Sequence, residues 1–330
     1  MSGAFVHHHS AHCESGVAAA LARDAGQPFS EAMVFGITSA LAFVFLPLVK
    51  INGLPLVAYR MPPRHILRAI RRLGVPLRFE TFANPEAGMR RLDALLGEDR
   101  LVGLQACVYW LPYFPQSMRF HFNAHNLLVF GKVGESYVIS DPVFERAQQC
   151  PHADLAKARF THGLLAPKGF LYYVNGAARI SPLEPLLRKA IRRTAFIMAG
   201  RVPIPFVGAR AIRGFATAVE RLPVEGDTQY SRRHLGHIVH MQEIIGTGGA
   251  GFRFLYAAFL QEAAAILGLP VLNEFSARLT AVGDAWREVA LAAARMSKGR
   301  TPLDPTTIGT QLRTLADREQ AYFRDLRQAV

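Results

Sequence analysis

The chain contains few cysteines, few lysines and few charged residues for its length of 330 residues. Cys13, Cys107 and Cys150 are its only cysteines, and such a small, odd number excludes a disulfide framework and favours a reducing compartment. The N-terminus has no basic stretch followed by an apolar run, so the sequence shows no secretory signal peptide. We therefore expect a cytoplasmic protein.

One apolar run, residues 32–49, comes close to the length of a membrane-spanning helix. Small or polar residues and a proline interrupt the run at Gly36, Thr38, Ser39 and Pro47, and no positively charged cluster flanks it. We therefore predict a buried helix followed by a buried strand, and no stable insertion into a membrane.

Acidic residues are scarce relative to basic ones, with 25 Asp and Glu against 38 Lys and Arg. The excess lies in the second half: residues 1–150 carry 14 basic and 11 acidic residues, whereas residues 151–330 carry 24 and 14. A strongly basic half of a protein is expected to meet an acidic partner. Because 50% of the residues are hydrophobic, the chain can bury a large core, which excludes extensive disorder.

The pattern of helices and strands divides the chain into two parts. The first part alternates predicted helices (14–25, 64–73, 86–96) with predicted strands (54–59, 77–82, 102–109), and the part beyond Pro151 is mostly helical (183–198, 209–222, 233–245, 252–267, 276–296, 306–329). We therefore predict an α+β domain over residues 1–150 and a mostly helical, basic domain over residues 151–330.

The clearest local signal is a β-hairpin between residues 125–131 and 136–141, with Gly134 in the turn. If the hairpin is centred near this turn, the sequence positions of two residues that oppose each other add up to about 267. Positions 125 and 141 add up to 266, so we expect the side chains of His125 and Asp141 to lie side by side across the hairpin.

Cys13 stands at the start of the first predicted helix, where the helix dipole and the unpaired N–H groups stabilise a thiolate. A histidine held by a carboxylate can exchange a proton with such a thiol during acyl transfer, as His125 and Asp141 would. An early cysteine on a helix, followed by His and Asp on later strands, is the papain-like order. The residues alone also allow a structural buried cysteine and an ordinary His–Asp pair.

Several segments of the sequence resemble the butirosin biosynthesis protein H family. In the first half the resemblance lies in residues 12–16 (His-Cys-Glu-Ser-Gly), in residues 30–37, and in the hairpin with its Ser-Asp-Pro ending at residues 140–142. In the second half it lies in residues 245–253 and 259–263, so that it covers most of the chain.

This resemblance implies an α+β enzyme with a papain-like (cysteine-peptidase-like) N-terminal domain and a mostly helical C-terminal domain. It implies transfer of an acyl group from an acyl-carrier-protein thioester to a small amine, in secondary-metabolite biosynthesis. Cys13 would be the acylated nucleophile, His125 the base and Asp141 its orienting partner, and His12 and Glu14 would contact the substrate.

The N-terminal domain of this family looks like the papain-like peptidases that clip double-glycine leader peptides, and those peptidases carry a Gln a few residues before the Cys as an oxyanion donor. This sequence departs from that pattern, because no Gln lies between Met1 and Cys13. The backbone N–H of Cys13 would then need a second donor, such as His7 or His12. A thioesterase or a cysteine peptidase on the same triad is the alternative reaction. A carrier-protein-binding module without catalysis is the alternative outside enzymes.

A glycine-rich segment, Gly246-Thr-Gly-Gly-Ala-Gly251, precedes a predicted helix in the second half. The segment before it is helical rather than a strand, which excludes a Rossmann dinucleotide site. A glycine nest beside a basic residue can hold a phosphate, and we expect the phosphate of a donor's phosphopantetheine there. The predicted ligands are Gly246, Gly248, Gly249, Arg253 and Tyr256. The alternative is a tight turn between helices, and no cofactor of the protein's own is expected.

Residues 179–213 contain eight basic residues and one acid, Glu184. Arg188, Arg192 and Arg193 are predicted to dock an acidic carrier protein, where charge acts on encounter and orientation. The alternative is a solvated cationic face. No nucleic-acid-binding motif is present, so no nucleic-acid partner is expected.

The histidines at positions 7–9 and 12 lack a companion ligand pair at zinc spacing, so we expect no metal site. A homo-oligomer is compatible with the sequence.

Overall fold

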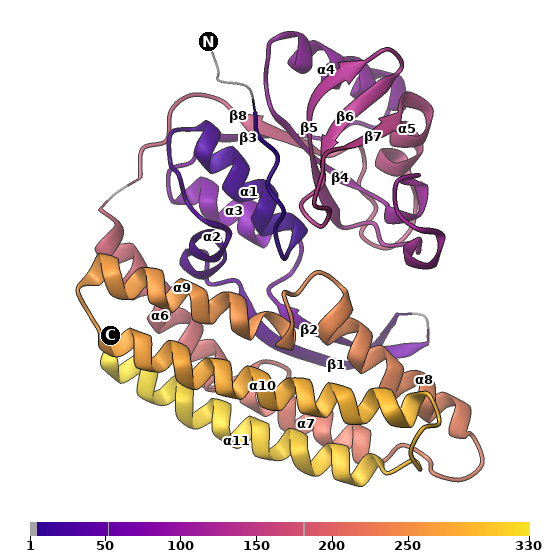
Figure 1. Ribbon diagram of the computed structural model, residues 1–330, viewed down its shortest axis with the longest axis vertical. Coiled ribbons are helices and arrows are strands. Elements are labelled where there is room, and N and C mark those ends of the chain that lie inside the picture. The colour runs from indigo at the N-terminus through magenta and orange to yellow at the C-terminus, as the bar shows by residue number, and fades with distance from the viewer. Residues whose placement is uncertain (1–4, 52, 181) are drawn as a thin grey trace. The chain divides into compact units, whose positions relative to one another are not determined.

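Segments far apart in the sequence share each of two structural units in the computed structural model, which describes residues 5–51, 53–180 and 182–330 (Figure 1). The first unit comprises Met1–Val34 and Pro63–Ser181, and the second comprises Phe35–Pro62 and Pro182–Val330. This division differs from the predicted domains at 1–150 and 151–330. Residues 35–62 belong to the second unit instead of the first, and residues 151–181 belong to the first unit instead of the second. A strand in each of these segments pairs or packs with elements that are distant in the sequence.

The first unit is built on a six-stranded sheet in which every neighbouring pair is antiparallel. The order across the sheet is β3 (Leu77–Glu80), β8 (Leu171–Val174), β4 (Val102–Ala106), β5 (His125–Val133), β6 (Ser136–Ser140) and β7 (Gln148–Pro151). Strand β8 lies between β3 and β4 although it follows both in the chain. The first unit therefore extends well beyond residue 150.

Helices cover both faces of this sheet (Figure 1). The helices with the main contacts to its strands are α1 (Cys13–Asp24), α4 (Pro85–Gly97) and α5 (His152–Phe160). The helices α2 (Glu31–Ile37), which begins in this unit, and α3 (His65–Arg72) lie outside these contacts, as do the 3₁₀ turns η1 (Val108–Trp110) and η2 (Gln116–Met118). Helices α4 and α5 pack on one face, where Leu92, Leu104, Leu127 and Leu155 form part of a fully buried apolar core. Helix α1 packs on β5 and β8 and contacts α3.

The second unit is mostly helical, with one two-stranded sheet of β1 (Leu41–Ile51) and β2 (Leu54–Arg60). Its helices are α6 (Leu183–Met198), α7 (Gly208–Glu220), α8 (Thr228–Val239), α9 (Arg253–Leu267), α10 (Val271–Ser297) and α11 (Pro305–Ala329), with short turns η3 (His240–Ile244) and η4 (Ala250–Phe252). Helices α9, α10 and α11 run beside one another in Figure 1, and α10 contacts both others.

Aromatic rings from the hairpin and the helices form the core of the second unit. Trp286 of α10 stacks on Phe43 of β1 at 5.7 Å and meets Tyr59 of β2 edge to face, also at 5.7 Å. Phe215 of α7 lies 5.8 Å from Phe43. Because large aromatic rings contribute strongly to burial, this cluster explains why residues 35–62 belong to the second unit.

The α+β class is confirmed: a helix that starts at a cysteine and packs on an antiparallel sheet is the papain-like arrangement, and the second unit is mostly helical. The helix and the strand predicted within residues 32–49 are present as α2 and β1, but only the first part of β1 is buried, and Leu48 is 93% exposed. The predicted helix over 233–245 ends as α8 at Val239 and continues as the π-turn η3.

By length and hydropathy, one segment of the described chain qualifies as a membrane span. It is Ala250–Leu267, around helix α9, and 61% of it is buried inside the protein. The core helix of a globular unit meets the same criterion.

Candidate active site

Cys13 is the first residue of α1, and His12 is the residue that caps this helix. The His12 backbone is extended, with φ −136° and ψ 134°, and its Nδ1 accepts a hydrogen bond from the Ser15 backbone N–H at 3.3 Å. A side-chain acceptor at this position satisfies an N–H group that the helix leaves unpaired. The sulfur of Cys13 therefore lies at the positive end of the helix, and the residue is only 7% exposed.

Glu31, at the start of α2, holds the chain segment that enters α1. Its carboxylate accepts hydrogen bonds from the backbone N–H groups of Ala11 and His12, both at 2.8 Å, and from the Ser15 hydroxyl at 2.9 Å. The sequence analysis placed Glu31 only within the resembling segment 30–37. Its role as an anchor depends on a contact between α2 and the N-terminal segment, which no local pattern signals.

His125 and Asp141 form the pair that the hairpin predicts. Nε2 of His125 lies 2.7 Å from Oδ2 of Asp141, and both residues are buried. The pairing register differs from the prediction: Leu128 opposes Ser140, a sum of 268, and a bulge between Val129 and Gly131 raises the sum to 269 towards the turn. The two side chains therefore meet diagonally, near the end of β6, rather than directly across the hairpin.

The Asp141 carboxylate is held by two further donors. The Tyr113 hydroxyl donates to Oδ2 at 2.9 Å, and the Val143 backbone N–H donates to Oδ1 at 3.3 Å. The ring of Phe114 packs edge to face against His125, with centroids 5.4 Å apart. The donors satisfy the buried carboxylate, and a carboxylate held in this way fixes the orientation of the imidazole that it binds.

The electrostatics of this pair favour a charged imidazolium. Burial by itself lowers the pKa of His125, but the Asp141 charge, its hydrogen bond and the Cys13 sulfur outweigh burial and raise the pKa to about 10. Cys13 thus contributes to the environment of His125 through both a hydrogen bond and its charge. The three predicted catalytic residues are brought together within the first unit.

Asn126 is a site residue that the sequence analysis missed. Its Nδ2 lies 3.9 Å from Sγ of Cys13 and also donates to the Ala124 carbonyl oxygen at 3.1 Å. The Tyr172 hydroxyl, from β8, donates to Oδ1 of Asn126 at 2.9 Å and thereby fixes which way the amide faces. Its position next to His125, on a strand facing α1, is the only signal in the sequence.

The two histidines proposed as oxyanion donors have other partners in the structure. His7 contacts the Ser140 hydroxyl at 2.7 Å and the Phe144 carbonyl oxygen at 2.9 Å through its two ring nitrogens. Nδ1 of His12 contacts both the N–H and the hydroxyl of Ser15. Nδ1 of His12 therefore caps α1, and the substrate contact of this residue stays a prediction.

Glu14 also has a structural role in place of the predicted substrate contact. Its side chain is fully buried, and Oε1 accepts hydrogen bonds from the N–H groups of Ile66 at 3.0 Å and Leu67 at 3.4 Å. These are the first turns of α3, whose N-cap residue Arg64 makes no side-chain capping bond. Glu14, the residue after Cys13, therefore anchors α3 to α1.

The glycine-rich segment of the second unit does not support the predicted phosphate site. A carboxylate and a hydroxyl already accept from its N–H groups: Ala250 donates to Glu243 at 3.0 Å and Gly249 donates to Thr247 at 3.1 Å. The segment bends tightly through Gly246, Gly248 and Gly249, all at positive φ. This geometry agrees with the alternative of a tight turn between helices.

Arg253 and Tyr256, the other predicted phosphate ligands, are both fully buried in the second unit. The Arg253 guanidinium makes two hydrogen bonds to Glu319, at 2.8 and 3.0 Å, and lies 4.7 Å from the Trp286 ring centroid. Its charge is therefore neutralised inside the core, and it has a structural role.

The three arginines predicted to dock a carrier lie on α6, where Arg192 and Arg193 are exposed and Arg188 is half-buried. Arg192 also donates to the Val330 carbonyl oxygen. Within residues 5–51, 53–180 and 182–330, no group of three or more His, Cys, Asp and Glu side chains is arranged to hold a metal ion.

Two family models match the chain over adjacent segments. Residues 12–142 match the model described as butirosin biosynthesis protein H, N-terminal, and residues 153–326 match a domain of unknown function, DUF4872. The second match alone covers more than half of the chain. No curated protein matches the sequence significantly.

Among solved structures, the chain is similar to a crystal structure of a putative C39-like peptidase from Bacillus anthracis. The identity is 12%, the match covers 54% of this chain and 96% of that chain, and the TM-score is 0.37. The chain belongs to the family of the domain of unknown function DUF4872, whose model matches more than half of it, and Cys13, His125 and Asp141 all lie in the segment that matches the N-terminal model of butirosin biosynthesis protein H.

Proposed function

We propose that this protein is a cysteine-dependent acyltransferase that takes an acyl group from a carrier-bound thioester and gives it to an amine. The observation that carries the proposal is the buried pair of His125 and Asp141, 2.7 Å apart, beside a cysteine at a helix N-terminus. A thiolate with an oriented imidazolium is the arrangement that attacks acyl groups through a covalent intermediate.

In the first half-reaction, the Cys13 thiolate attacks the carbonyl carbon of the donor thioester. The bond between that carbon and the donor sulfur breaks, and the departing thiolate takes a proton from the imidazolium of His125. The product is an acyl-enzyme with a new thioester at Cys13. Donors at the helix N-terminus and the Asn126 amide lie where they support the negative charge on sulfur and oxygen.

In the second half-reaction, an amine attacks the acyl-enzyme and forms an amide. Neutral His125 accepts the proton of the amine, and the bond to the Cys13 sulfur breaks, which restores the thiolate and the imidazolium. Cys13 and His125 are 7% and 5% exposed, and this burial supports transfer over hydrolysis because it limits the access of water. The match of residues 12–142 to a family model named for a biosynthesis protein supports it too.

The donor in this proposal is an acidic acyl carrier protein whose phosphopantetheine bears the acyl group, so the enzyme needs no cofactor of its own. The exposed Arg192 and Arg193 and the half-buried Arg188 on α6 offer the positive charge for docking. Reversing the charge of Arg193 is expected to raise the KM for carrier-bound substrate but leave the KM for a small thioester unchanged. Equal effects on both KM values would argue against docking on α6.

Intact-protein mass spectrometry after mixing with short acyl thioesters tests the proposed function. We expect an added acyl mass on the wild type, no added mass on Cys13→Ala, and loss of the adduct with amide formation when an amine is supplied. Loss of the adduct at the same rate without an amine would indicate a thioesterase. Absence of any adduct with a panel of chain lengths would instead favour a binding module.

A further inference from the structure

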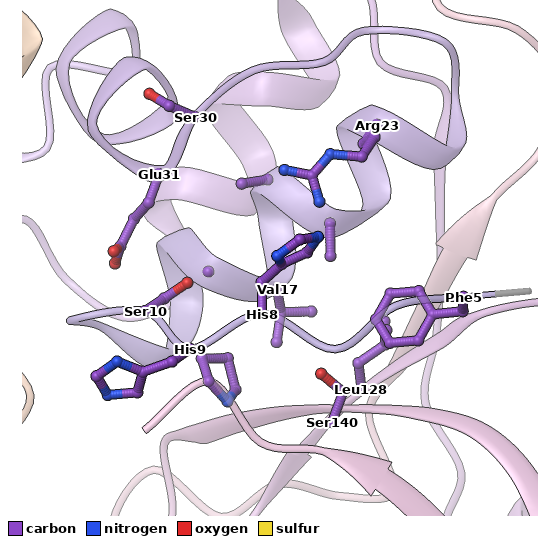
Figure 2. Close-up of a pocket in the computed structure, with 14 residues that line it drawn as sticks. Phe5, His8, His9, Ser10, Val17, Arg23, Ser30, Glu31, Leu128 and Ser140 are labelled. Carbon is purple, nitrogen blue, oxygen red and sulfur yellow. The ribbon is translucent and has the colours of Figure 1, made fainter. Parts of the chain in front are cut away.

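A cavity of about 260 Å³ lies in the first unit between α1, the N-terminal segment and the ends of β5 and β6 (Figure 2). Its apolar wall includes Phe5, Val17, Ala20 and Leu128. Cys13, His125 and Asp141 do not line it, so it is separate from the candidate active site. Its volume is near the lower end of small-molecule sites, roughly 300 Å³, so it suits a small ligand.

Small residues on one face of α1 create this space. At Gly16, a Cβ atom would meet the Cβ atoms of Pro142 and Ser10 at 2.8 Å. Further along the same face stand Ala19 and Ala20. Larger side chains at these positions would fill the cavity, because residues three and four apart share a face of a helix.

One end of the cavity carries positive charge. The exposed side chain of Arg23 lines the cavity, as do Ala19 and Ala20 one turn before it on α1. Within residues 5–51, 53–180 and 182–330, no carboxylate forms an ion pair with Arg23. Figure 2 shows the His8 ring next to this guanidinium.

Burial, then Arg23 and His7, lowers the pKa of His8, which keeps its imidazole neutral near pH 7 and able to donate one hydrogen bond. His9, the second imidazole at the cavity, interacts with Glu31. A guanidinium and an imidazole therefore face the same end of the cavity.

Glu31 is the one acidic residue that lines the cavity. Its oxygens accept hydrogen bonds from the Ala11 and His12 N–H groups and from the Ser15 hydroxyl, so the carboxylate serves the entry of α1. Arg23 and His8 are both exposed, so they stand where the cavity meets solvent, and an anion that enters the cavity could accept hydrogen bonds from both.

We propose that this cavity binds a small molecule with a carboxylate head and a short aliphatic tail. The head accepts hydrogen bonds from Arg23 and His8, and the tail lies against Phe5 and Ala20, which are only partly buried. The site goes beyond the proposed acyl transfer, because the hydrogen bond from Ser10 N–H to the Pro142 carbonyl oxygen, at 2.7 Å, separates it from the nucleophile. A ligand there would fasten residues 5–10, which lead into the cap of α1.

Titration of the full chain with hexanoate, followed by calorimetry and by thermal unfolding, tests this inference. We expect saturable binding of hexanoate. Hexanol, which has the aliphatic tail but no charge, and inorganic phosphate, which has the charge but no tail, should each bind with at least tenfold lower affinity. Arg23→Met is expected to weaken hexanoate binding at least tenfold. Ala20→Phe is expected to abolish it by filling the cavity while Arg23 remains. Arg78→Met, which changes an exposed arginine outside the cavity, is the matched control.

Two further arms separate this site from the candidate active site. Cys13→Ala is expected to bind hexanoate like the wild type, whereas competition between hexanoate and alkylation of Cys13 would overturn a separate site. Failure of hexanoate and octanoate to bind at millimolar concentration, or unchanged binding by Arg23→Met, would also overturn the proposal. Equal affinity for phosphate and hexanoate would contradict the proposal that the ligand has an aliphatic tail. None of these outcomes depends on acyltransferase activity, so each is independent of the proposed function.

Discussion

The amide nitrogen of Asn126 lies 3.9 Å from the sulfur of Cys13, although 113 residues separate the two in the chain. The Tyr172 hydroxyl holds the other end of the amide, so the N–H group rather than the carbonyl oxygen faces the sulfur. This contact joins three elements, α1, β5 and β8, around one atom. It makes Asn126 a positioning residue for the thiolate and the basis of the first prediction.

Asn126→Leu, which keeps the side-chain volume but removes the donor, is expected to raise the pH midpoint of Cys13 alkylation. A hydrogen bond to a charged group contributes about 1.5–3 kcal/mol, which corresponds to a shift of about one to two pH units. Tyr172→Phe should give a smaller shift in the same direction. The rate of iodoacetamide labelling at Cys13, followed by mass spectrometry against pH, measures both, with the exposed Asn175→Leu as control.

Asp141→Asn is expected to keep the fold and to lower turnover by about four orders of magnitude, as loss of the orienting carboxylate does in related triads. The amide that replaces the carboxylate carries no charge, so His125 loses its charged partner. The imidazole ring can then rotate or change tautomer. Steady-state kinetics with a small acyl thioester measures the effect, and circular dichroism checks the fold. Turnover within tenfold of the wild type would remove Asp141 from the proposed mechanism.

The stability of the protein is expected to fall as the pH rises from about 6.5 towards 10. The pKa of His125 is raised in the folded state to about 10, so the stabilisation is complete below the unfolded value near 6.5 and is lost as the pH passes through the folded value. Urea unfolding between pH 6 and 10 should show this decline, on the order of a few kcal/mol. Asp141→Asn should flatten the decline, and a profile identical to the wild type would contradict the assignment.

Glu14→Ala is expected to destabilise the protein by about 1–3 kcal/mol, because two buried N–H groups at the start of α3 lose their acceptor. Glu14→Gln, which keeps an acceptor oxygen, should cost less. Urea unfolding at neutral pH measures both. If Glu14 instead contacted substrate, both variants would change KM while leaving the unfolding midpoint unchanged.

Glu319→Ala is expected to cost about 3–5 kcal/mol, because it leaves the buried guanidinium of Arg253 without its partner. The Trp286 indole, which donates to Glu319 at 2.6 Å, would lose its acceptor as well. Thermal unfolding with tryptophan fluorescence measures the loss. Arg313→Ala, which removes a surface pair with Glu220, is the control and should cost at most about 1 kcal/mol.

Much of the local structure follows from the sequence because its causes are local. The helix predicted over 183–198 has those bounds in the structure, and the hairpin forms around Gly134, because periodicity and turn residues act within a few positions. The α+β class and the meeting of His125 with Asp141 are of this kind. The short strands β7 and β8 and the helix α5 were missed, since each is brief and its sheet partners lie elsewhere in the chain.

The sequence by itself determined that a cysteine begins a helix and that a histidine and an aspartate meet at the end of a hairpin. Only the tertiary structure decided which other side chains serve these three. Asn126 contacts Cys13, Glu14 accepts a hydrogen bond from α3, and Arg253 donates to Glu319. In each case the packing of elements that are distant in the sequence determines which polar partner lies within reach. A buried polar group must find a partner to offset its lost hydration, and which partner lies within reach depends on contacts that no local pattern encodes.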